Sequence, residues 1–363
     1  MKKILVITPF FYPHIGGSER YMEELYVFLK KKHRQVSIDV LCYNTDNSPE
    51  SESYRGLNVV RIPCWTILPG QFLLPKPLPL LKFLNSHKSY DLVHTSTRFF
   101  DSSWWAPLYA KLTKTKIVLT DHCAYHPRSN NSFIDLIIRV VEATIVRFSL
   151  HFYDSIYVES KKTGEFLKQT FGVSSTLAYP GLSNENPILN NTSNKRVKVV
   201  YIGRMIESKG VRILFDIAEK IPQVDFVFAA AGPLESLLKK HAGSNILILG
   251  GVSKEKVAEI IQGADILAYP SWHSEGLPMA LVEAAEAGIA VLATDTGAID
   301  ELIVNGKTGM LVKPKNIEAF ENALRALVGD SALRLKLGIA LQSYAKKNFS
   351  WETAANLIAK EIS

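Results

Sequence analysis

Two acidic residues, Glu275 and Glu283, have seven residues between them in the segment SEGLPMALVEA. A helix is predicted from Pro278, which places Glu275 in the preceding loop and Glu283 about one and a half turns into the helix. The amides of Gly276 and Leu277 and the amino end of this helix could hold a phosphate, and the carboxylates could accept hydrogen bonds from sugar or ribose hydroxyls. The plainer alternative is one loop acid and one surface acid. That alternative is weakened because the rest of the helix is apolar, and a buried carboxylate must be paired or hydrogen-bonded.

A pair of cations, Arg204 and Lys209, lies in the segment GRMIESKG, directly after a predicted strand at Val197–Ile202. Arginine binds phosphate oxygens as a fork, and lysine acts as a point charge. Two such residues on one strand–helix connection could neutralise a diphosphate. The alternative, two solvated basic residues on a loop, stays open on this pattern alone.

Two features of the first half occupy the same kind of position. Gly16 and Gly17 follow a predicted strand at Ile4–Thr8 and precede a helical pattern. Glycines let a ligand approach the backbone, and a helix amino end offers N–H groups to an anion. His122 follows a predicted strand at Ile117–Thr120, where it could donate a hydrogen bond to a substrate hydroxyl. The alternatives are an ordinary turn and a structural histidine.

Several other chemistries have no signature in the chain. The segment TDHCAYH, which holds His122, lacks the HExxH spacing of a zinc helix, so no metal is expected. There is no GxSxG for a hydrolase, and no GxGxxG after the first strand for a dehydrogenase. The three cysteines form neither a zinc-ligand pattern nor an even disulfide set, which favours a reducing cytoplasm.

Short β-branched runs alternate with helical patterns along the whole chain, which predicts parallel sheets covered on both faces. The expected strands are Ile4–Thr8, Ser37–Leu41, Asn58–Ile62, Leu92–Thr95, Ile117–Thr120, Ser155–Val158, Val197–Ile202, Asp225–Ala230, Ile246–Leu249, Ile266–Ala268, Val291–Ala293 and Met310–Val312. The expected helices include Ser18–Lys32, Gly210–Lys220, Lys254–Gln262, Pro278–Ala287 and Ile317–Val328. Ligands of such sheets bind at the carboxyl ends of the strands, where the candidate residues lie.

The length of 363 residues predicts two domains. A turn-rich, polar stretch at 180–195 separates two α/β halves, and the predicted domains are residues 1–182 and 183–343. Each is expected to be a doubly wound, Rossmann-like α/β domain, and the two are expected to face a central cleft.

The net charge of +7 lies mostly in the first half, where residues 1–185 hold 22 Lys and Arg against 16 Asp and Glu. This excess favours a phosphate-bearing substrate or an anionic membrane surface over nucleic acid, for which there is no motif. Residues 65–84 are strongly apolar, and their four prolines exclude one continuous helix. They are expected to form either a packed irregular segment or an exposed surface that touches lipid. The basic run Lys30–Arg34 could add attraction to anionic lipid, or be a solvated helix end.

The motifs together resemble the retaining glycosyltransferases of glycosyltransferase family 4, also described as glycosyl transferases group 1. The similarity is densest over residues 197–315 and is carried by GRMIESKG, AAAGPLE, ILGGVSKEKVAEIIQGADILAYPS, EGLPMALVEAAEAGIAVLAT and GAIDELIVNGKTGMLVKP. The spacing of Glu275 and Glu283 is similar to the EX7E signature of that family. The resemblance implies the GT-B fold, with two Rossmann-like domains, and implies that a C-terminal segment, residues 344–363, returns to the first domain.

The resemblance also implies roles for individual residues in binding a nucleotide-sugar donor. Arg204 and Lys209 would grip the diphosphate, and Glu283 would bind the ribose. The donor sugar and phosphates would be held by a larger set comprising Glu275, Gly276, Leu277, Pro278, Gly232, Gly16 and Gly17. His122 would contact the sugar near the reacting carbon. The expected catalytic residues are therefore His122, Glu275, Arg204 and Lys209.

The activity implied is transfer of a hexosyl-type sugar from a UDP- or GDP-sugar to a hydroxyl, with retention of configuration and without a metal. Retention is expected to follow front-face attack, with the departing phosphate helping to deprotonate the acceptor. Domain closure is expected to exclude water. Three rivals share the fold: a sugar-nucleotide 2-epimerase, a non-catalytic nucleotide-sugar-binding partner subunit, and a DNA-modifying transferase.

The acceptor expected from the basic, apolar first domain is a glycan or lipid-linked glycan, as in cell-surface polysaccharide or glycolipid assembly. The apolar start of the chain ends at Phe11–Pro13 without a cleavage site, and no run of 18 apolar residues exists. A cytoplasmic protein is therefore expected, with peripheral contact at the cytoplasmic face of the membrane through the first domain.

Overall fold

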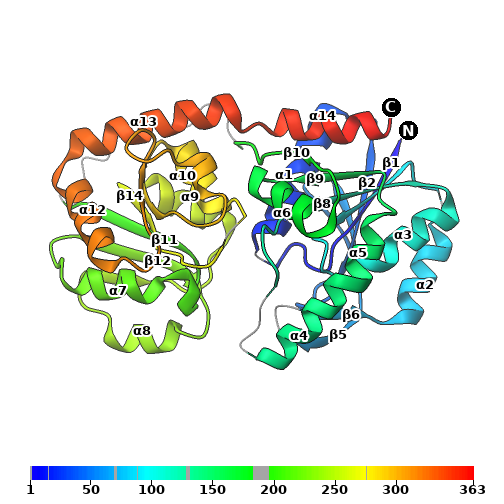
Figure 1. Cartoon of the computed structure of the whole chain (residues 1–363), viewed down its shortest axis with the longest axis horizontal. Helices are drawn as coiled ribbons and strands as arrows, with labels where there is room; N and C mark the ends of the chain where they lie inside the picture. Colours follow the sequence, from blue (N-terminus) through cyan, green and yellow to red (C-terminus); the bar gives the residue numbers. More distant parts are fainter. Residues whose placement is uncertain are drawn as a thin grey trace. The chain divides into compact units, whose positions relative to one another are not determined.

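The computed structural model describes residues 2–14, 16–68, 72–87, 89–127, 131–182, 196–274 and 276–363. The chain divides into two compact units (Figure 1). Unit 1 comprises Met1–Pro180 and Trp351–Ser363, and unit 2 comprises Gly181–Ser350. The predicted domain limits were 182/183 and 343/344, whereas the units divide at 180/181 and 350/351.

Unit 1 is built on an eight-stranded sheet in the order β10-β9-β8-β7-β1-β2-β4-β3. All pairings are parallel except that of β3 with β4. The strands are β1 (Lys3–Ile7), β2 (Ser37–Tyr43), β3 (Ser51–Tyr54), β4 (Leu57–Ile62), β7 (Leu92–Ser96), β8 (Lys116–Asp121), β9 (Ser155–Val158) and β10 (Thr176–Leu177). A separate antiparallel hairpin joins β5 (Cys64–Leu68) to β6 (Phe72–Pro75).

Helices cover both faces of this sheet. Leu5 and Ile7 of β1 share a cluster with residues of α2 and α3, so Ile4 and Val6 point to the opposite face, where they are also fully buried. Burial on both faces explains why these strands are continuous apolar runs. The helices of unit 1 are α1 (Gly17–Lys32), α2 (Pro77–Ser86), α3 (Ser102–Thr113), α4 (Ser132–Val141), the π-helix η1 (Glu142–Val146), α5 (Arg147–Leu150), α6 (Lys161–Phe171) and α14 (Trp351–Glu361).

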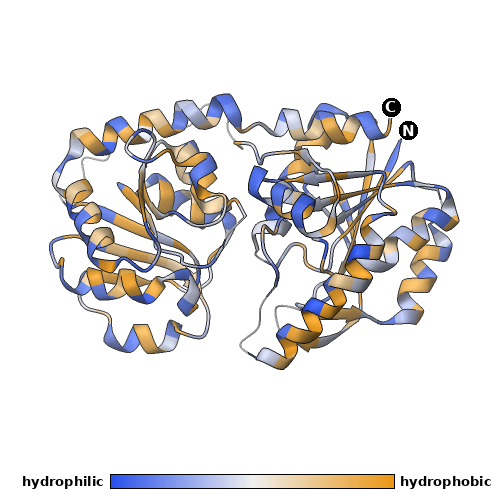
Figure 2. Ribbon diagram, in the orientation of Figure 1, coloured by the Kyte–Doolittle hydropathy of each residue, from blue (hydrophilic) through white to orange (hydrophobic). Residues whose placement is uncertain are grey.

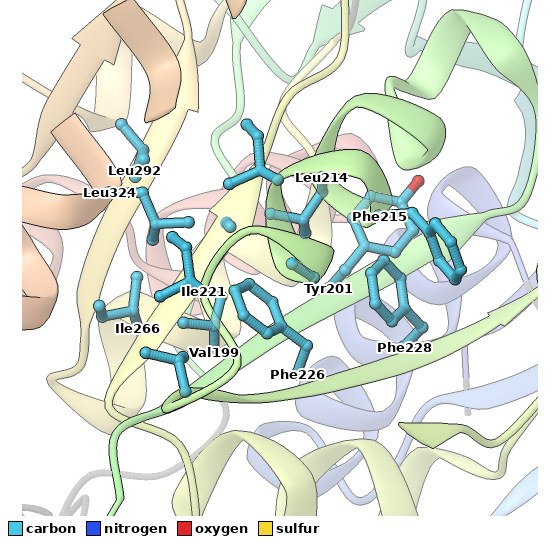
Figure 3. Packing of buried hydrophobic residues seen from close by; sticks show 14 of the residues in the cluster. Val199, Tyr201, Leu214, Phe215, Ile221, Phe226, Phe228, Ile266, Leu292 and Leu324 are labelled. Carbon is cyan, nitrogen blue, oxygen red and sulfur yellow. The ribbon is translucent and has the colours of Figure 1, made fainter. Parts of the chain in front are cut away.

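Unit 2 has a six-stranded, fully parallel sheet in the order β13-β12-β11-β14-β15-β16. The strands are β11 (Lys198–Arg204), β12 (Asp225–Ala231), β13 (Ile246–Ile248), β14 (Ile266–Tyr269), β15 (Ala290–Thr294) and β16 (Met310–Val312). The helices are the 3-10 helix η2 (Glu207–Lys209), α7 (Val211–Glu219), α8 (Glu235–His241), α9 (Lys254–Gln262), α10 (Met279–Ala287), α11 (Ile299–Leu302), α12 (Ile317–Gly329) and α13 (Ser331–Asn348). Figure 3 shows Tyr201, Phe226 and Phe228 of the sheet packed with Leu214 and Phe215 of α7.

Each sheet has one point where the order of its strands reverses. In unit 2 the chain passes from β11 outward to β13 and then returns to the other side of β11 with β14. In unit 1 it passes from β1 outward to β4 and returns beside β1 with β7. The crevice beyond the carboxyl ends of the strands at such a reversal is where open α/β sheets bind ligands. The expectation of two doubly wound α/β domains is confirmed.

The C-terminal helix α14 belongs to unit 1, where it packs along α1. The Trp351 ring meets the Tyr21 ring edge-on, with centroids 5.1 Å apart, and Lys32 pairs with Glu352. The segment expected to return to the first domain started at Tyr344, which instead lies in α13 of unit 2.

In the apolar segment 65–84, the described residues lie mostly in regular elements, so the alternative of an irregular segment was wrong for them. The segment holds the β5–β6 hairpin and the start of α2, which begins at Pro77 because proline fits the first turn of a helix. Trp65, Ile67 and Leu78 are exposed, in line with the second alternative. None of the helices in the described part of the chain combines the length and the apolar character that crossing a bilayer requires.

Candidate donor site and its first-unit counterpart

The two cations predicted in unit 2 lie on the connection from β11 to α7. Arg204 is the last residue of β11 and is exposed. Lys209 ends η2 and is only 8% exposed, and its Nζ donates a hydrogen bond to the Tyr269 hydroxyl at 3.2 Å. The contact joins the β11 connection to the end of β14, the two sides of the strand reversal. The Arg204 side chain is therefore in solvent, whereas Lys209 is held against the edge of the sheet.

Glycines let this connection pass close to its neighbours. Gly210 has φ +68°, and a Cβ there would lie 2.1 Å from the Pro270 carbonyl oxygen. Gly232 follows β12 with φ +152°, and a Cβ there would lie 2.6 Å from the Met205 carbonyl oxygen. Neither position accepts a larger residue without moving backbone. Gly232 therefore shapes the site as backbone, next to the loop that follows Arg204.

The loop after β14 is tied to the loop after β11 through one carbonyl. The Ser208 oxygen accepts hydrogen bonds from the backbone N–H groups of Trp272 (3.0 Å) and His273 (3.2 Å). A hydroxyl of Ser271 donates to the same oxygen at 3.3 Å. The two connections that flank the reversal are thus one hydrogen-bonded unit, so a ligand held by one is placed against the other.

The predicted phosphate loop leads into α10. Gly276 is half-buried and Leu277 is 3% exposed, so the Leu277 side chain is part of the packing. Pro278 precedes the helix as its extended N-terminal cap, and α10 begins one residue later than predicted. The first N–H groups of a helix have no acceptor within the helix.

Of the two acids of the EX7E pattern, the structure describes Glu283 and not Glu275. Glu283 lies in α10, half-buried between the buried residues Val282 and Ala284. A carboxylate in such a place is held by hydrogen bonds or by charge. Glu275 lies outside the described residues, so its proposed role is not tested by this structure.

In unit 1, Gly16 and Gly17 stand at the start of α1, after β1. Gly16 is the extended N-terminal cap of α1. A Cβ at Gly16 would collide with the Glu19 carboxylate, whereas one at Gly17 would meet no described atom within 4 Å. The backbone of Gly17 therefore borders open space beside the reversal between β1 and β7.

His122 comes directly after β8, and Glu159 comes directly after the neighbouring strand β9. The parallel register pairs Asp121 with Val158, which brings the next residue of each strand together. The His122 Nδ1 lies 2.7 Å from Glu159 Oε2, and both residues are buried. The imidazole Nε2 is also buried and has no hydrogen-bond partner among the described residues. With Glu159 accepting from Nδ1–H, Nε2 is the ring atom available to a ligand.

A second histidine, His94, lies near His122 and has a structural role. Its Nδ1 and Nε2 are both hydrogen-bonded, to the Tyr26 hydroxyl at 2.5 Å and the Thr120 hydroxyl at 2.8 Å. Complete burial, with a smaller effect of the nearby His122, lowers the pKa of His94 to about 3. His94 is therefore neutral in the folded protein at ordinary pH.

Arg98 holds the loop that follows His122. It is fully buried, and its guanidinium donates to Asp121 Oδ2 at 2.5 Å and to the carbonyl oxygens of Cys123 (2.7 Å) and Tyr125 (2.6 Å). It also donates to Glu142 Oε1 at 3.2 Å, at the first residue of η1. One side chain therefore fixes the backbone after His122 and joins it to the helix that follows.

The structure joins the connection that holds Arg204 and Lys209 to the loop after β14, through the contacts of Ser208 and Lys209. Three residues of these sites were missed: Tyr269, which holds Lys209, Glu159, which holds His122, and Arg98. Each follows or ends a strand at the carboxyl edge of its sheet. The rule that directed attention to the loops after strands could therefore have found them.

Two protein-family models match the sequence. The family described as "Glycosyltransferase Family 4" matches residues 15–185, and the family described as "Glycosyl transferases group 1" matches residues 184–345. An uncharacterised glycosyltransferase of Methanocaldococcus jannaschii is 26% identical, over 97% of this chain and 96% of that protein. A GDP-mannose-dependent α-(1-6)-phosphatidylinositol monomannoside mannosyltransferase of Mycolicibacterium smegmatis is 22% identical, over 99% of this chain and 98% of that protein.

Among solved structures, Anabaena HepE in complex with UDP and glucose superposes with a TM-score of 0.75. It is 17% identical, and the match covers 99% of each chain. The fold is that of the GT-B glycosyltransferases. The chain belongs to the family 4 glycosyltransferases, as the motifs predicted.

Proposed function

We propose that this glycosyltransferase moves a hexosyl group from a UDP- or GDP-sugar to a hydroxyl, with retention of the anomeric configuration. The proposal rests on the loops after β11 and β14 in unit 2, which are hydrogen-bonded to each other where the strand order reverses. They place Arg204, Lys209 and the amino end of α10 at one sheet edge. A nucleoside diphosphate leaving group needs this kind of positive charge as negative charge develops on its oxygens.

The roles within the site follow from its chemistry and from the family resemblance. Arg204 and Lys209 stabilise the departing diphosphate, and the backbone of Gly276 to Pro278 contacts the sugar and phosphate. Glu283 binds the ribose hydroxyls, and Gly232 lets the adjoining loop approach the donor. Glu275 positions the sugar and is not a nucleophile. No metal takes part, because these groups supply the charge that a cation would otherwise supply.

Two regions of unit 1 take part in the same reaction under this proposal. The backbone at Gly16 and Gly17 contacts the donor phosphates. The His122 Nε2, which Glu159 leaves free for a ligand, hydrogen-bonds the donor sugar near the reacting carbon. The departing phosphate then assists removal of the proton from the acceptor hydroxyl, so the reaction needs no carboxylate pair of the glycosidase kind.

The acceptor proposed is a lipid-linked or cell-surface glycan, and the site of action is the cytoplasmic face of the membrane. The name of the Mycolicibacterium relative includes both a GDP-sugar donor and a phosphatidylinositol-based acceptor. The basic charge of residues 1–185 suits substrates and surfaces of that sort.

The test is to incubate the purified chain with a UDP-sugar or a GDP-sugar, each with and without a membrane lipid extract. Transfer predicts that labelled sugar enters the lipid fraction with unchanged anomeric configuration, and that prior treatment with EDTA makes no difference. An epimer formed from the nucleotide sugar without any acceptor would instead identify the 2-epimerase. Absence of any turnover, with nucleotide binding intact, would identify a binding subunit.

A further inference from the structure

The helical segment from α4 to α5 carries an apolar face that is exposed in the described part of unit 1. No residue of α4 is buried, although seven of its ten residues are phenylalanine, leucine, isoleucine or valine. Phe133 is 68% exposed, and Phe148 in α5 is 69% exposed. The other large apolar side chains exposed along the segment and just beyond it are Leu136, Ile137, Val140, Ile145 and Phe152.

The π-helix η1 keeps this face in line. Exposed residues recur at Phe133, Ile137, Val140, Thr144 and Phe148, mostly every fourth position. In a pure α-helix of 3.6 residues per turn such a row drifts around the axis, and a wider π-turn absorbs the drift. Figure 2 shows the hydrophobic colour recurring along α4 and α5.

The opposite side of the segment is fixed in unit 1. Glu142 is buried and is bound by Arg98 and by His126 Nδ1 at 2.5 Å. Val146 and Leu150 are buried in a cluster with residues of β8, β9 and α6. Unit 1 therefore fixes the segment through η1 and α5. The exposed apolar side chains have a cost in water unless something covers them.

The fully exposed charges along this face are basic. Arg139 and Arg147 are exposed, and the Lys111 ammonium of α3 lies 5.5 Å from the centre of the Phe152 ring. Of the two acids in the segment, Glu142 is buried and Asp135 is half-buried. An apolar face flanked by arginine and lysine is the pattern of a helix that lies in the interface of an anionic bilayer.

We propose that the α4–α5 face lies in the surface of a membrane that contains anionic lipid. The inference deepens the proposed function, since a lipid-linked acceptor is held in such a surface. The proposal assigns the membrane contact to α4–α5 and not to the basic run Lys30–Arg34, which the sequence had suggested. There Lys30 binds the Val36 carbonyl and Lys32 binds Glu352. Figure 1 shows α4 and α14 on opposite sides of unit 1, and α14 packs along α1, the helix that holds Lys30.

The experiment uses the full chain and sedimentation with vesicles of phosphatidylcholine, alone or with about one third phosphatidylglycerol. The double variant Leu136→Ser/Phe148→Ser is predicted to lower partitioning into the mixed vesicles by about tenfold or more, because two large apolar side chains no longer insert. The control is Leu335→Ser on α13, where the leucine is 57% exposed against 58% for Leu136, and it should bind like the parent. Arg139→Gln should weaken binding to the mixed vesicles only, and Arg34→Gln should have no effect.

Three results would overturn the proposal. The first is that the parent chain sediments with neither kind of vesicle, and the second is that the double variant binds as well as the parent. The third is that Arg34→Gln is the substitution that abolishes binding. A concentration-dependent dimer that the double variant dissolves, without vesicle binding, would assign the face to a second copy of the chain. Urea unfolding of each variant checks that it is folded. The readout needs neither donor nor acceptor, so its failure leaves the proposed transferase activity standing.

Discussion

The Nδ1 atom of His122 lies 2.7 Å from a carboxylate oxygen of Glu159, and the two residues occupy matching positions after adjacent parallel strands. The pair is buried under the edge of the Tyr21 ring, whose centroid is 4.9 Å from that of the imidazole. Tyr21 in turn contacts Trp351, the first residue of the C-terminal helix. His122 is therefore held on several sides, and only its Nε2 is left for a ligand.

Removal of the Glu159 carboxylate should change the tautomer of His122. Glu159→Leu is expected to release Nδ1–H, so that part of the imidazole population moves its proton to Nε2, with a loss of roughly tenfold or more in kcat/KM. The 15N spectrum of histidine-labelled protein reports the tautomer, with the His122 signals assigned from a His122→Asn sample. Glu165→Leu, at an exposed position in α6, is the control. An unchanged His122 tautomer in Glu159→Leu would show that Glu159 does not position the ring.

Loss of the exposed cation at the end of β11 should affect the chemical step. Arg204→Ala is expected to lower kcat/KM by roughly 10²-fold, because the charge stabilises a leaving group that is fully negative only as the bond breaks. Arg212→Ala removes an exposed arginine nearby in α7 and should leave the rate unchanged. A normal rate for Arg204→Ala, or an equal loss for Arg212→Ala, would contradict the role given to Arg204.

The close approach at Gly210 should make this position intolerant of a side chain. Gly210→Ala is expected to destabilise the protein by more than about 2 kcal/mol, since alanine is strained at this φ and its Cβ would displace the Pro270 carbonyl. Gly329→Ala, at the exposed end of α12 with no described atom within 4 Å of its Cβ, should be neutral or stabilise by roughly 0.5 kcal/mol. Urea unfolding followed by circular dichroism measures both. Equal stabilities for the two variants would refute the packing argument.

The lowered pKa of His94 predicts how stability depends on pH. The folded state keeps His94 neutral down to about pH 3, whereas the unfolded chain takes up the proton below about pH 6.5. Protonation therefore favours unfolding as the pH falls through this window. Relative to His94→Gln, the parent should lose about 1 kcal/mol of stability between pH 6.5 and 5.5 and about 1.3 kcal/mol between pH 5.5 and 4.5, as measured by urea unfolding. A stability difference that stays constant with pH would mean that His94 does not resist protonation.

The main strands and the helices that follow the candidate loops could be predicted because each is buried on one or both faces, and burial leaves a pattern in the sequence. Strand β3, with the sequence SESY, and the two-residue β10 leave no such pattern, and both were missed. The α4–α5 helix was also absent from the predicted helices. Its apolar face points outward, and its period changes at the π-helix, so the ordinary helical spacing does not describe it.

The sequence predicted those site residues that belong to a local motif. The cations and the EX7E acids follow strands, and parallel strands bring their carboxyl ends to one edge. The position of Glu159 and Arg98 after strands was a local signal, but which residue each of them contacts was not. Arg98 and Glu142 are far apart in sequence, and only the folded chain shows that one arginine joins them. The pairing of His122 with Glu159 depends in the same way on strand register, which the sequence does not state.

The central claim is that the connections after β11 and β14 bind a nucleoside diphosphate, and thermal unfolding tests it directly. The chain is heated with UDP, GDP, ADP or TDP, beside Glu283→Ala and the control Glu286→Ala from the same helix. A ligand at about 100 times its Kd adds roughly 2.7 kcal/mol to the state that binds it. We predict a higher Tm with one nucleotide, lost in Glu283→Ala and kept in Glu286→Ala. No rise with any of the four, or a rise that survives Glu283→Ala unchanged, would contradict the proposed donor site.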